Sequence, residues 1–224
     1  MANVTFYGHC GFRIELGGRL VYTDPWIDAS PRETQRLVPS ALRPEEVRKA
    51  DLVLISTDQF DHFQKSVVEE IVQRTAAQVV APDSVLAQLQ IPTRCRLNSA
   101  PGDSFDAMGV DVSVVEARNP RSESWGFVLR GGGKSVYFAG PTWEWPGMSS
   151  IDVDLSILPI GGGATMDVLS AVKSLKMIRS KFVVPMHFDT YPRIKANTRD
   201  FEARARKESK TVPVVLQPGQ ALNF

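Results

Sequence analysis

The 224-residue sequence has only two cysteines, a formal charge of +1 and no apolar run long enough to cross a membrane. Two cysteines, Cys10 and Cys95, are too few for a disulfide framework, so we expect free thiols in a reducing compartment. The amino terminus lacks the basic segment and apolar run of a secretory signal, which favours a cytoplasmic protein. A near-neutral charge gives no reason to expect nucleic acid or a membrane as a partner.

The composition is that of a folded globular protein, with 43% hydrophobic and 23% charged residues. No linker, internal repeat or low-complexity segment divides the chain. Residues 1–224 are therefore predicted to form a single domain. Nothing in the sequence indicates an oligomeric state.

Strand-like and helix-like segments alternate in blocks. Strands are predicted at 4–7, 12–16, 20–24, 52–56, 78–82, 110–117, 125–130, 135–140, 154–160, 182–186 and 212–216. Helices are predicted from 44, at 64–74, from 83, at 167–178 and at 198–209, with Asp83, Asp167 and Thr198 as N-caps. Residues 25–43 are expected to form a long surface loop.

The order of these blocks is β-rich, α/β, β-rich and α/β. Many of the strands follow one another through hairpins rather than helices, which disfavours a doubly wound parallel sheet. Two halves of this kind can stack sheet on sheet with their helices outside. We therefore predict an α+β fold, an αββα sandwich of two mixed sheets packed face to face.

One segment carries clear chemistry, the predicted buried strand and loop D-L-V-L-I-S-T-D-Q-F-D-H at residues 51–62. Asp61 and His62 carry side chains that zinc accepts as ligands, whereas Thr57 and Gln59 do not. Asp58 lies between them as a candidate general base, or else as a solvated loop acid or helix cap. The loop therefore offers two candidate metal ligands, Asp61 and His62.

Eight segments, taken in order, resemble the metallo-β-lactamase superfamily, and within it small metal-dependent hydrolases related to the ascorbate-phosphate lactonases. They are G-H-C-G-F-R-I-E, V-Y-T-D-P-W, L-I-S-T-D-Q-F-D-H, V-V-E-A-R-N, Y-F-A-G-P-T, L-P-I-G-G-G-A-T-M-D, V-V-P-M-H-F-D-T-Y-P and L-Q-P-G-Q. The segments span the whole chain. The resemblance implies the metallo-β-lactamase fold and hydrolysis at a metal centre.

The ligand positions implied by the resemblance are only partly kept. The first-metal histidines and the bridging aspartate of a dinuclear member are replaced here by Thr57, Gln59, Asn119 and Pro141. The remaining ligands of the second metal are kept as Asp61, His62 and His187. The resemblance therefore implies a degenerate dinuclear site.

Two interpretations of the three kept residues remain open. In the first, they form a metal-free hydrogen-bonded cluster, and the protein lacks dinuclear hydrolase activity and binds a ligand or partner. In the second, they hold one divalent metal, preferably zinc, with an open position for hydrolysis of an ester, lactone or phosphoester. The cofactor is accordingly either absent or a single ion, and the partner is a small molecule.

Four further residues are expected near this site. His9 either lines or supports the site, as the resemblance implies, or is a hydrogen-bonded strand-end histidine. Asp24 either orients a ligand histidine or forms a turn before Pro25. Trp143 and Trp145 place two indoles at the rim of the cleft, where they stack a ligand, anchor a partner or fill the space of the missing metal.

Overall fold

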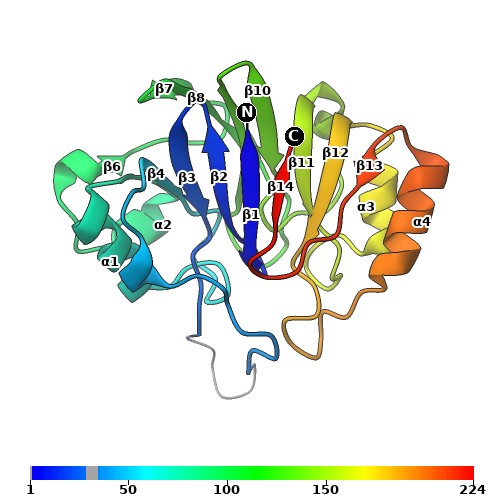
Figure 1. Ribbon diagram of the computed structural model, residues 1–224, viewed down its shortest axis with the longest axis horizontal. Coiled ribbons are helices and arrows are strands. Elements are labelled where there is room, and N and C mark those ends of the chain that lie inside the picture. Colours follow the sequence, from blue (N-terminus) through cyan, green and yellow to red (C-terminus); the bar gives the residue numbers. More distant parts are fainter. Residues whose placement is uncertain (1, 29–34) are drawn as a thin grey trace.

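The structure is a computed structural model that describes residues 2–28 and 35–224. Two seven-stranded sheets pack against each other, and helices cover the two outer sides (Figure 1). The predicted αββα sandwich is therefore confirmed. Residues 29–34, within the predicted surface loop, lie outside the described part of the chain.

The first sheet contains six strands from residues 3–97 and one strand from the carboxyl terminus. Its strand order is β14 (Ala221–Asn223), β1 (Asn3–Gly8), β2 (Gly11–Leu16), β3 (Arg19–Thr23), β4 (Leu52–Leu54), β5 (Gln78–Val80) and β6 (Arg96–Leu97). Strands β14 to β3 pair antiparallel and β3 to β6 pair parallel. Gly17 and Gly18 form the tight turn between β2 and β3, where their positive φ angles suit glycine.

The second sheet is built in the same way from later residues. Its strand order is β13 (Val212–Pro213), β12 (Arg179–Met186), β11 (Asp152–Pro159), β10 (Lys134–Phe138), β9 (Trp125–Gly131), β8 (Val110–Glu116) and β7 (Ser104–Ala107). Strands β7 to β10 pair antiparallel and β10 to β13 pair parallel. The predicted strand at 212–216 is shorter than expected, because only two of its residues pair with β12.

Within residues 2–28 and 35–224, four α-helices cover the outer faces. They are α1 (Lys65–Thr75) and α2 (Asp83–Leu86) beside the first sheet, and α3 (Val168–Ser174) and α4 (Thr198–Glu208) beside the second (Figure 1). Three 3₁₀ turns are η1 (Pro44–Glu46), η2 (Thr93–Cys95) and η3 (Pro146–Ser150). In the described residues, no helix has the length and apolarity that a membrane crossing needs.

The helix caps were predicted with mixed success. Asp167 caps α3 as predicted, since its carboxylate accepts the backbone N–H of Ser170 at 2.8 Å. Asn197, not Thr198, caps α4, because the Asn197 side-chain oxygen accepts the N–H of Asp200 at 3.1 Å. The Asp83 prediction is also wrong, since α2 begins at that residue and its preceding residue takes the N-cap position.

The two sheets share one apolar core, in which Phe12 from β2 meets Phe138 from β10 at 6.4 Å between ring centroids. At one edge the backbones of the two layers bond directly. The N–H of His187, after β12, donates to the carbonyl of His9, after β1, at 2.9 Å. The N–H of Trp125 likewise donates to the carbonyl of Ser56 at 2.8 Å. Polar loops that follow β1, β4 and β12 therefore meet at this edge.

Candidate metal centre

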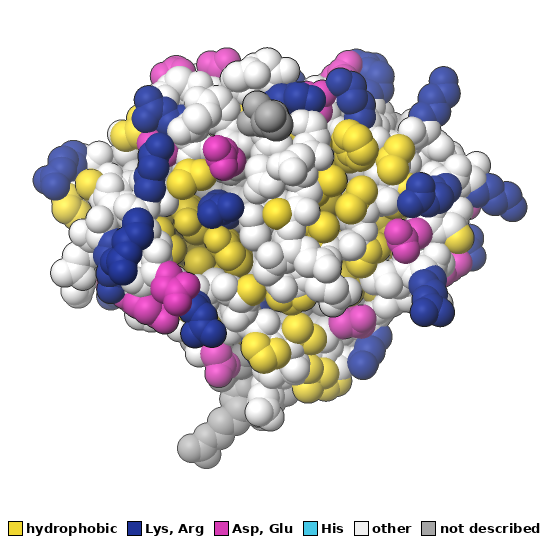
Figure 2. Space-filling model, in the orientation of Figure 1, with side chains coloured by type: hydrophobic (Ala, Val, Ile, Leu, Met, Phe, Trp, Pro, Cys, Tyr) yellow, Lys and Arg dark blue, Asp and Glu magenta, His cyan; other side chains and the backbone are white. Residues whose placement is uncertain are grey.

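All three histidines of the chain, His9, His62 and His187, lie together at this edge. Their ring centroids are 4.4 to 5.5 Å apart. The three residues are 2%, 0% and 5% exposed, and no histidine is visible on the face of the molecule drawn in Figure 2. Histidines from the three separate loops that follow β1, β4 and β12 thus form one buried cluster.

The local backbone aims these rings inward. His9 and His187 have φ angles of 58° and 56°, a left-handed conformation that is unusual for a residue other than glycine. Between β4 and α1, the N–H groups of His62 and Phe63 both donate to the carbonyl of Gln59 at 3.0 Å. This tight turn follows the fully buried strand β4 and places Asp61 and His62 in the cluster. Strained backbone of this kind concentrates at functional sites.

The Asp61 carboxylate lies within 4.0 Å of a ring nitrogen of each of the three histidines. Its Oδ2 is 3.4 Å from the Nε2 of His9 and 3.8 Å from the Nε2 of His187. Its Oδ1 is 4.0 Å from the Nε2 of His62, and Tyr191 donates its hydroxyl hydrogen to Oδ2. One potential ligand atom from each of Asp61 and the three histidines lies within 4.8 Å of the other three.

Several of these atoms lack the hydrogen bonds that buried polar groups normally have. The Nε2 atoms of His9 and His62, the Nδ1 of His187 and the Oδ1 of Asp61 have no partner in the described residues. An unpaired buried polar atom costs roughly 1–3 kcal/mol, so several in one place need a compensating group. Imidazole nitrogens and a carboxylate are the donors that divalent transition metals accept. The residues therefore fit a metal ion.

Asp24 contacts the cluster from the other side of His62. The Nδ1 of His62 lies 2.6 Å from the Asp24 Oδ2, and Ser56 donates both its N–H and its hydroxyl to the same carboxylate at 2.7 and 2.5 Å. A carboxylate behind a histidine is the usual support of a metal ligand, because it fixes the ring and leaves Nε2 free. The geometry thus favours the orienting role of Asp24 over a simple turn.

The protonation of the cluster also suits metal binding. Burial lowers the pKa of His9 to about 4, although the Asp61 carboxylate favours its protonation. Burial and the neighbouring His9 and His62 rings hold the pKa of His187 well below 6.5. Burial raises the pKa of the Asp61 carboxyl, but the surrounding imidazoles outweigh this effect and hold it well below 3.8. At neutral pH the cluster offers two neutral imidazoles and one carboxylate.

His62 differs from the other two histidines. Burial lowers its pKa, but Cys10 and Asp24 raise it, and the balance lies well above 6.5. The pKa of the buried Cys10 thiol is itself raised to about 11, so at neutral pH the thiol is uncharged and Asp24 is the effective partner. A metal ligand must lose its proton, so an ion that binds at Nε2 releases a proton from this ring.

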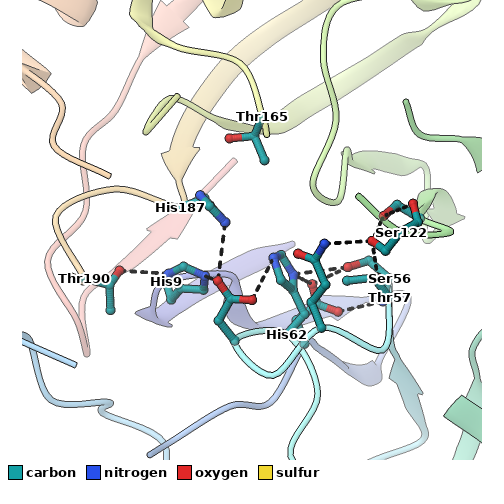
Figure 3. Close-up of polar contacts among 12 residues, drawn as sticks. His9, Ser56, Thr57, His62, Ser122, Thr165, His187 and Thr190 are labelled. Carbon is teal, nitrogen blue, oxygen red and sulfur yellow. Dashed lines mark hydrogen bonds and ion pairs between the residues drawn. The ribbon is translucent and has the colours of Figure 1, made fainter. Parts of the chain in front are cut away.

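Two positions that the resemblance assigns to first-metal ligands, Thr57 and Gln59, belong to a network of hydroxyl and amide groups. Ser122 is at its centre, 3.0 Å from the hydroxyl of Thr57 and 3.2 Å from that of Ser124, and it accepts from the Gln59 Nε2 at 2.8 Å (Figure 3). These groups satisfy one another, and all are poor metal ligands. Sequence patterns gave no signal for Ser122, because its role depends on a contact 63 residues away along the chain.

The other two positions that the resemblance assigns to metal ligands, Asn119 and Pro141, take no part in that network through any bond found in the described residues. The side-chain oxygen of Asn119 accepts the N–H of Arg121 at 2.9 Å and so shapes its own loop. Pro141 is buried directly after Gly140, where it offers no metal-binding atom. Asp58 is exposed and lies outside the buried cluster.

The two tryptophans of the expected rim differ in exposure. Trp143 is 48% exposed, so it does not fill the space of a missing metal. It borders a hollow of about 550 Å³ together with Glu144 and residues 116–120. Trp145 is partly buried against the core, and the Arg118 guanidinium lies 5.6 Å from its ring centroid. Only Trp143 therefore offers an open indole face.

Several residues of the site were missed from the sequence. Ser56, Ser122 and Tyr191 all act through hydrogen bonds to residues distant in the chain, with no spacing that marks them in advance. His9 was expected beside the site, and the structure brings its ring into the group of possible ligands. A sequence signal did exist for His9, since the chain has only three histidines.

Comparisons with known proteins agree with this geometry. A family model described as "Beta-lactamase superfamily domain" matches residues 3–187. A UPF0173 metal-dependent hydrolase of Pyrobaculum arsenaticum is 33% identical over 233 residues, covering 99% of both chains. A second, from Thermococcus onnurineus, is 31% identical over 240 residues and covers the whole of both.

Solved structures show the same fold. Igni18, a metallo hydrolase from the archaeon Ignicoccus hospitalis, superposes with a TM-score of 0.81 at 26% identity, covering 100% of this chain and 99% of that one. A possible metal-dependent hydrolase from Veillonella parvula reaches 0.82 at 13% identity over the whole of both chains, a likeness of fold alone. The link to ascorbate-phosphate lactonases stays a prediction. The chain belongs to the metallo-β-lactamase superfamily and, within it, to a family of metal-dependent hydrolases.

Proposed function

We propose that the protein is a hydrolase that works with one divalent metal ion, bound by Asp61, His62 and His187. The observation that carries this assignment is the convergence of buried nitrogen and oxygen atoms that have no hydrogen-bond partner in the described residues. A metal-free hydrogen-bonded cluster would join these atoms by hydrogen bonds, and none is found between them in the described residues.

A bound divalent metal would polarise a carbonyl or phosphoryl oxygen and lower the pKa of a water molecule. Esters, lactones and phosphoesters are the substrate classes that this chemistry suits. The protein residues have positioning roles. Asp24 fixes the ring of His62, and Tyr191 holds Asp61 through its hydroxyl. Burial of the cluster excludes bulk water and so strengthens its electrostatic interactions.

A second metal ion is not expected beside the first. Thr57 and Gln59 hydrogen-bond to Ser122, and Pro141 stands where a bridging carboxylate would be needed. A second cation would therefore find only neutral oxygen and amide groups, which transition metals bind weakly. The proposed hydrolase is mononuclear for this reason.

The metal content of the purified protein is the first test. After dialysis against trace zinc, manganese and iron, elemental mass spectrometry should find about one tightly bound ion per chain. Hydrolysis of a panel of lactones, esters and phosphoesters should disappear with a chelator and return when the metal is restored. A protein that holds no metal under these conditions would exclude the proposed function.

The double variant Thr57→His, Gln59→His should still bind only about one metal per chain. Two imidazoles would be restored, but no bridging carboxylate, and both new rings would have to displace the network around Ser122. The measurement is the metal-to-protein ratio of the variant beside that of the unaltered protein. A ratio of two would show that the first-metal positions are wrongly assigned.

A second candidate function is small-molecule binding without hydrolysis. It is favoured by the exposed indole of Trp143 beside the 550 Å³ hollow, since exposed tryptophans are frequent anchors in binding sites. Binding of substrate-like esters that survives metal removal and is lost in Trp143→Ala would identify this function. Binding that depends on the metal alone would leave the hydrolase assignment in place.

A further inference from the structure

We propose that His9 is a fourth protein ligand of the single metal ion, an assignment that rests on the function proposed above. The superfamily's metal-binding positions, carried onto this chain, do not include His9. Yet its ring is 98% buried and its Nε2 lies 3.4 Å from the Asp61 Oδ2, closer than the corresponding contact of His187 at 3.8 Å. By position, His9 is therefore as central to the cluster as the ligands already named.

The hydrogen bonds around Thr190 fix the tautomer of His9. The Thr190 hydroxyl donates its one hydrogen to the carbonyl of Phe188 at 3.1 Å. Toward the Nδ1 of His9, 2.9 Å away, the same hydroxyl must therefore accept (Figure 3). The His9 hydrogen thus sits on Nδ1, and the Nε2 lone pair faces the cluster.

The Nε2 lone pair of His9 is a hydrogen-bond acceptor, and it faces another acceptor, the Asp61 carboxylate. The Nε2 of His9 makes no hydrogen bond to any described residue, and its near neighbour is a carboxylate oxygen of Asp61. Two buried acceptors 3.4 Å apart repel each other unless a cation lies against both. A metal ion that binds Asp61 and His62 is such a cation, and it would take the His9 nitrogen as a donor.

The support of His9 parallels that of His62. Each ring has an oxygen acceptor behind its Nδ1, the Asp24 carboxylate at 2.6 Å for His62 and the Thr190 hydroxyl at 2.9 Å for His9. Partners of this kind orient metal-binding histidines and hold Nε2 ready for the ion. Thr190 is thus a positioning residue for His9.

A fourth protein donor changes the choice of metal. Zinc with four protein ligands is typical of a closed structural site, whereas catalytic zinc keeps a position free. Hydrolysis at a set of three imidazoles and one carboxylate would therefore need an ion that accepts more than four donors, such as Mn²⁺ or Fe²⁺. This differs from the preference for zinc predicted from three ligands.

Nitrogen NMR of the protein loaded with ¹¹³Cd²⁺ tests the assignment directly. With ¹⁵N-labelled histidine, the three rings give three separate sets of signals. A nitrogen bonded to the ion shows a ¹¹³Cd–¹⁵N coupling, and we expect one coupling in each ring. Couplings in His62 and His187 only would overturn the role of His9 but keep the proposed function, whereas no coupling in any ring would overturn both.

Variants of Thr190 test its positioning role through metal affinity rather than activity. Thr190→Val keeps the size of the side chain but removes the acceptor, and it should weaken metal binding about 10-fold in competition with a chromophoric chelator. Thr190→Ser restores the hydroxyl and should bind the metal as the unaltered protein does. Equal affinity in all three proteins would show that Thr190 has no such role.

Discussion

The His187→Ala variant is expected to lose metal binding by more than about 100-fold and to lose hydrolase activity with it, since even outer partners of metal ligands cost roughly 10- to 100-fold. His187 is the proposed ligand contributed by the second sheet, and two other proposed ligands, Asp61 and His62, both come from one loop of the first. Without it, the remaining proposed ligands, Asp61, His62 and His9, all come from loops of the first sheet.

The fold should survive this change. The Nδ1 of His187 has no partner in the described residues, so its removal breaks no hydrogen bond at that atom. The ring lies at the edge of the sandwich and outside the apolar core that holds the sheets together. Elemental analysis and circular dichroism on the same sample provide the measurement. Asp58→Ala, an exposed carboxylate in the same loop as Asp61, is the control and should keep its metal.

Full metal content in His187→Ala would contradict the ligand assignment. Loss of metal together with loss of the folded circular dichroism signal would instead indicate a structural role for the ring. The experiment therefore separates a ligand from a packing residue, which activity alone does not.

Among changes that add one methyl group at the edge of the site, Gly140→Ala should be the most destabilising. It should lower the free energy of unfolding by about 3 kcal/mol. Gly140 has a φ of 63°, where an L side chain costs about 1–2 kcal/mol. An added Cβ would also overlap the carbonyl oxygen of Trp125 and press on Ser56, and overpacking of this kind costs roughly 1–3 kcal/mol more. For a chain of this size the melting temperature should fall by about 6–12 °C.

Gly133→Ala is the matched control for this prediction. Its φ of 72° imposes the same backbone cost, but no described atom lies within 4 Å of the added Cβ. It should destabilise the protein by only about 1–2 kcal/mol in thermal or denaturant unfolding. Equal losses in the two variants would show that the close approach of Gly140 to Trp125 is unimportant.

The sequence predicted the fold class correctly because hairpins and helices leave periodic patterns that survive in one chain. The strands that it missed, β6, β7 and β14, have two, four and three residues, too few to show alternation. The helix caps at Asp83 and Thr198 were wrong by one residue, because several polar residues near a helix start can serve as caps.

The candidate site was predictable only as far as residue types could be matched along the chain. Asp61, His62 and His187 stood out because their side chains are common metal ligands. The ring of His9 points into the cluster because of its left-handed φ of 58° and its contact with Thr190, 181 residues away. The network around Ser122 is likewise a product of chain folding, so local sequence could not indicate it.

The backbone bond from His187 to His9 has a consequence for the protein as a whole. It joins the two layers of the sandwich at the place where the cluster forms. A metal ion bound by residues of both sheets would add a further link between the two layers at the same edge. A ligand that binds only the folded state stabilises it by mass action, by about 2.7 kcal/mol when the free ligand concentration is 100 times the dissociation constant. The melting temperature of the protein would therefore depend on how fully the ion is bound. When metal is scarce, the proposed hydrolase would then lose its activity and part of its folding stability together.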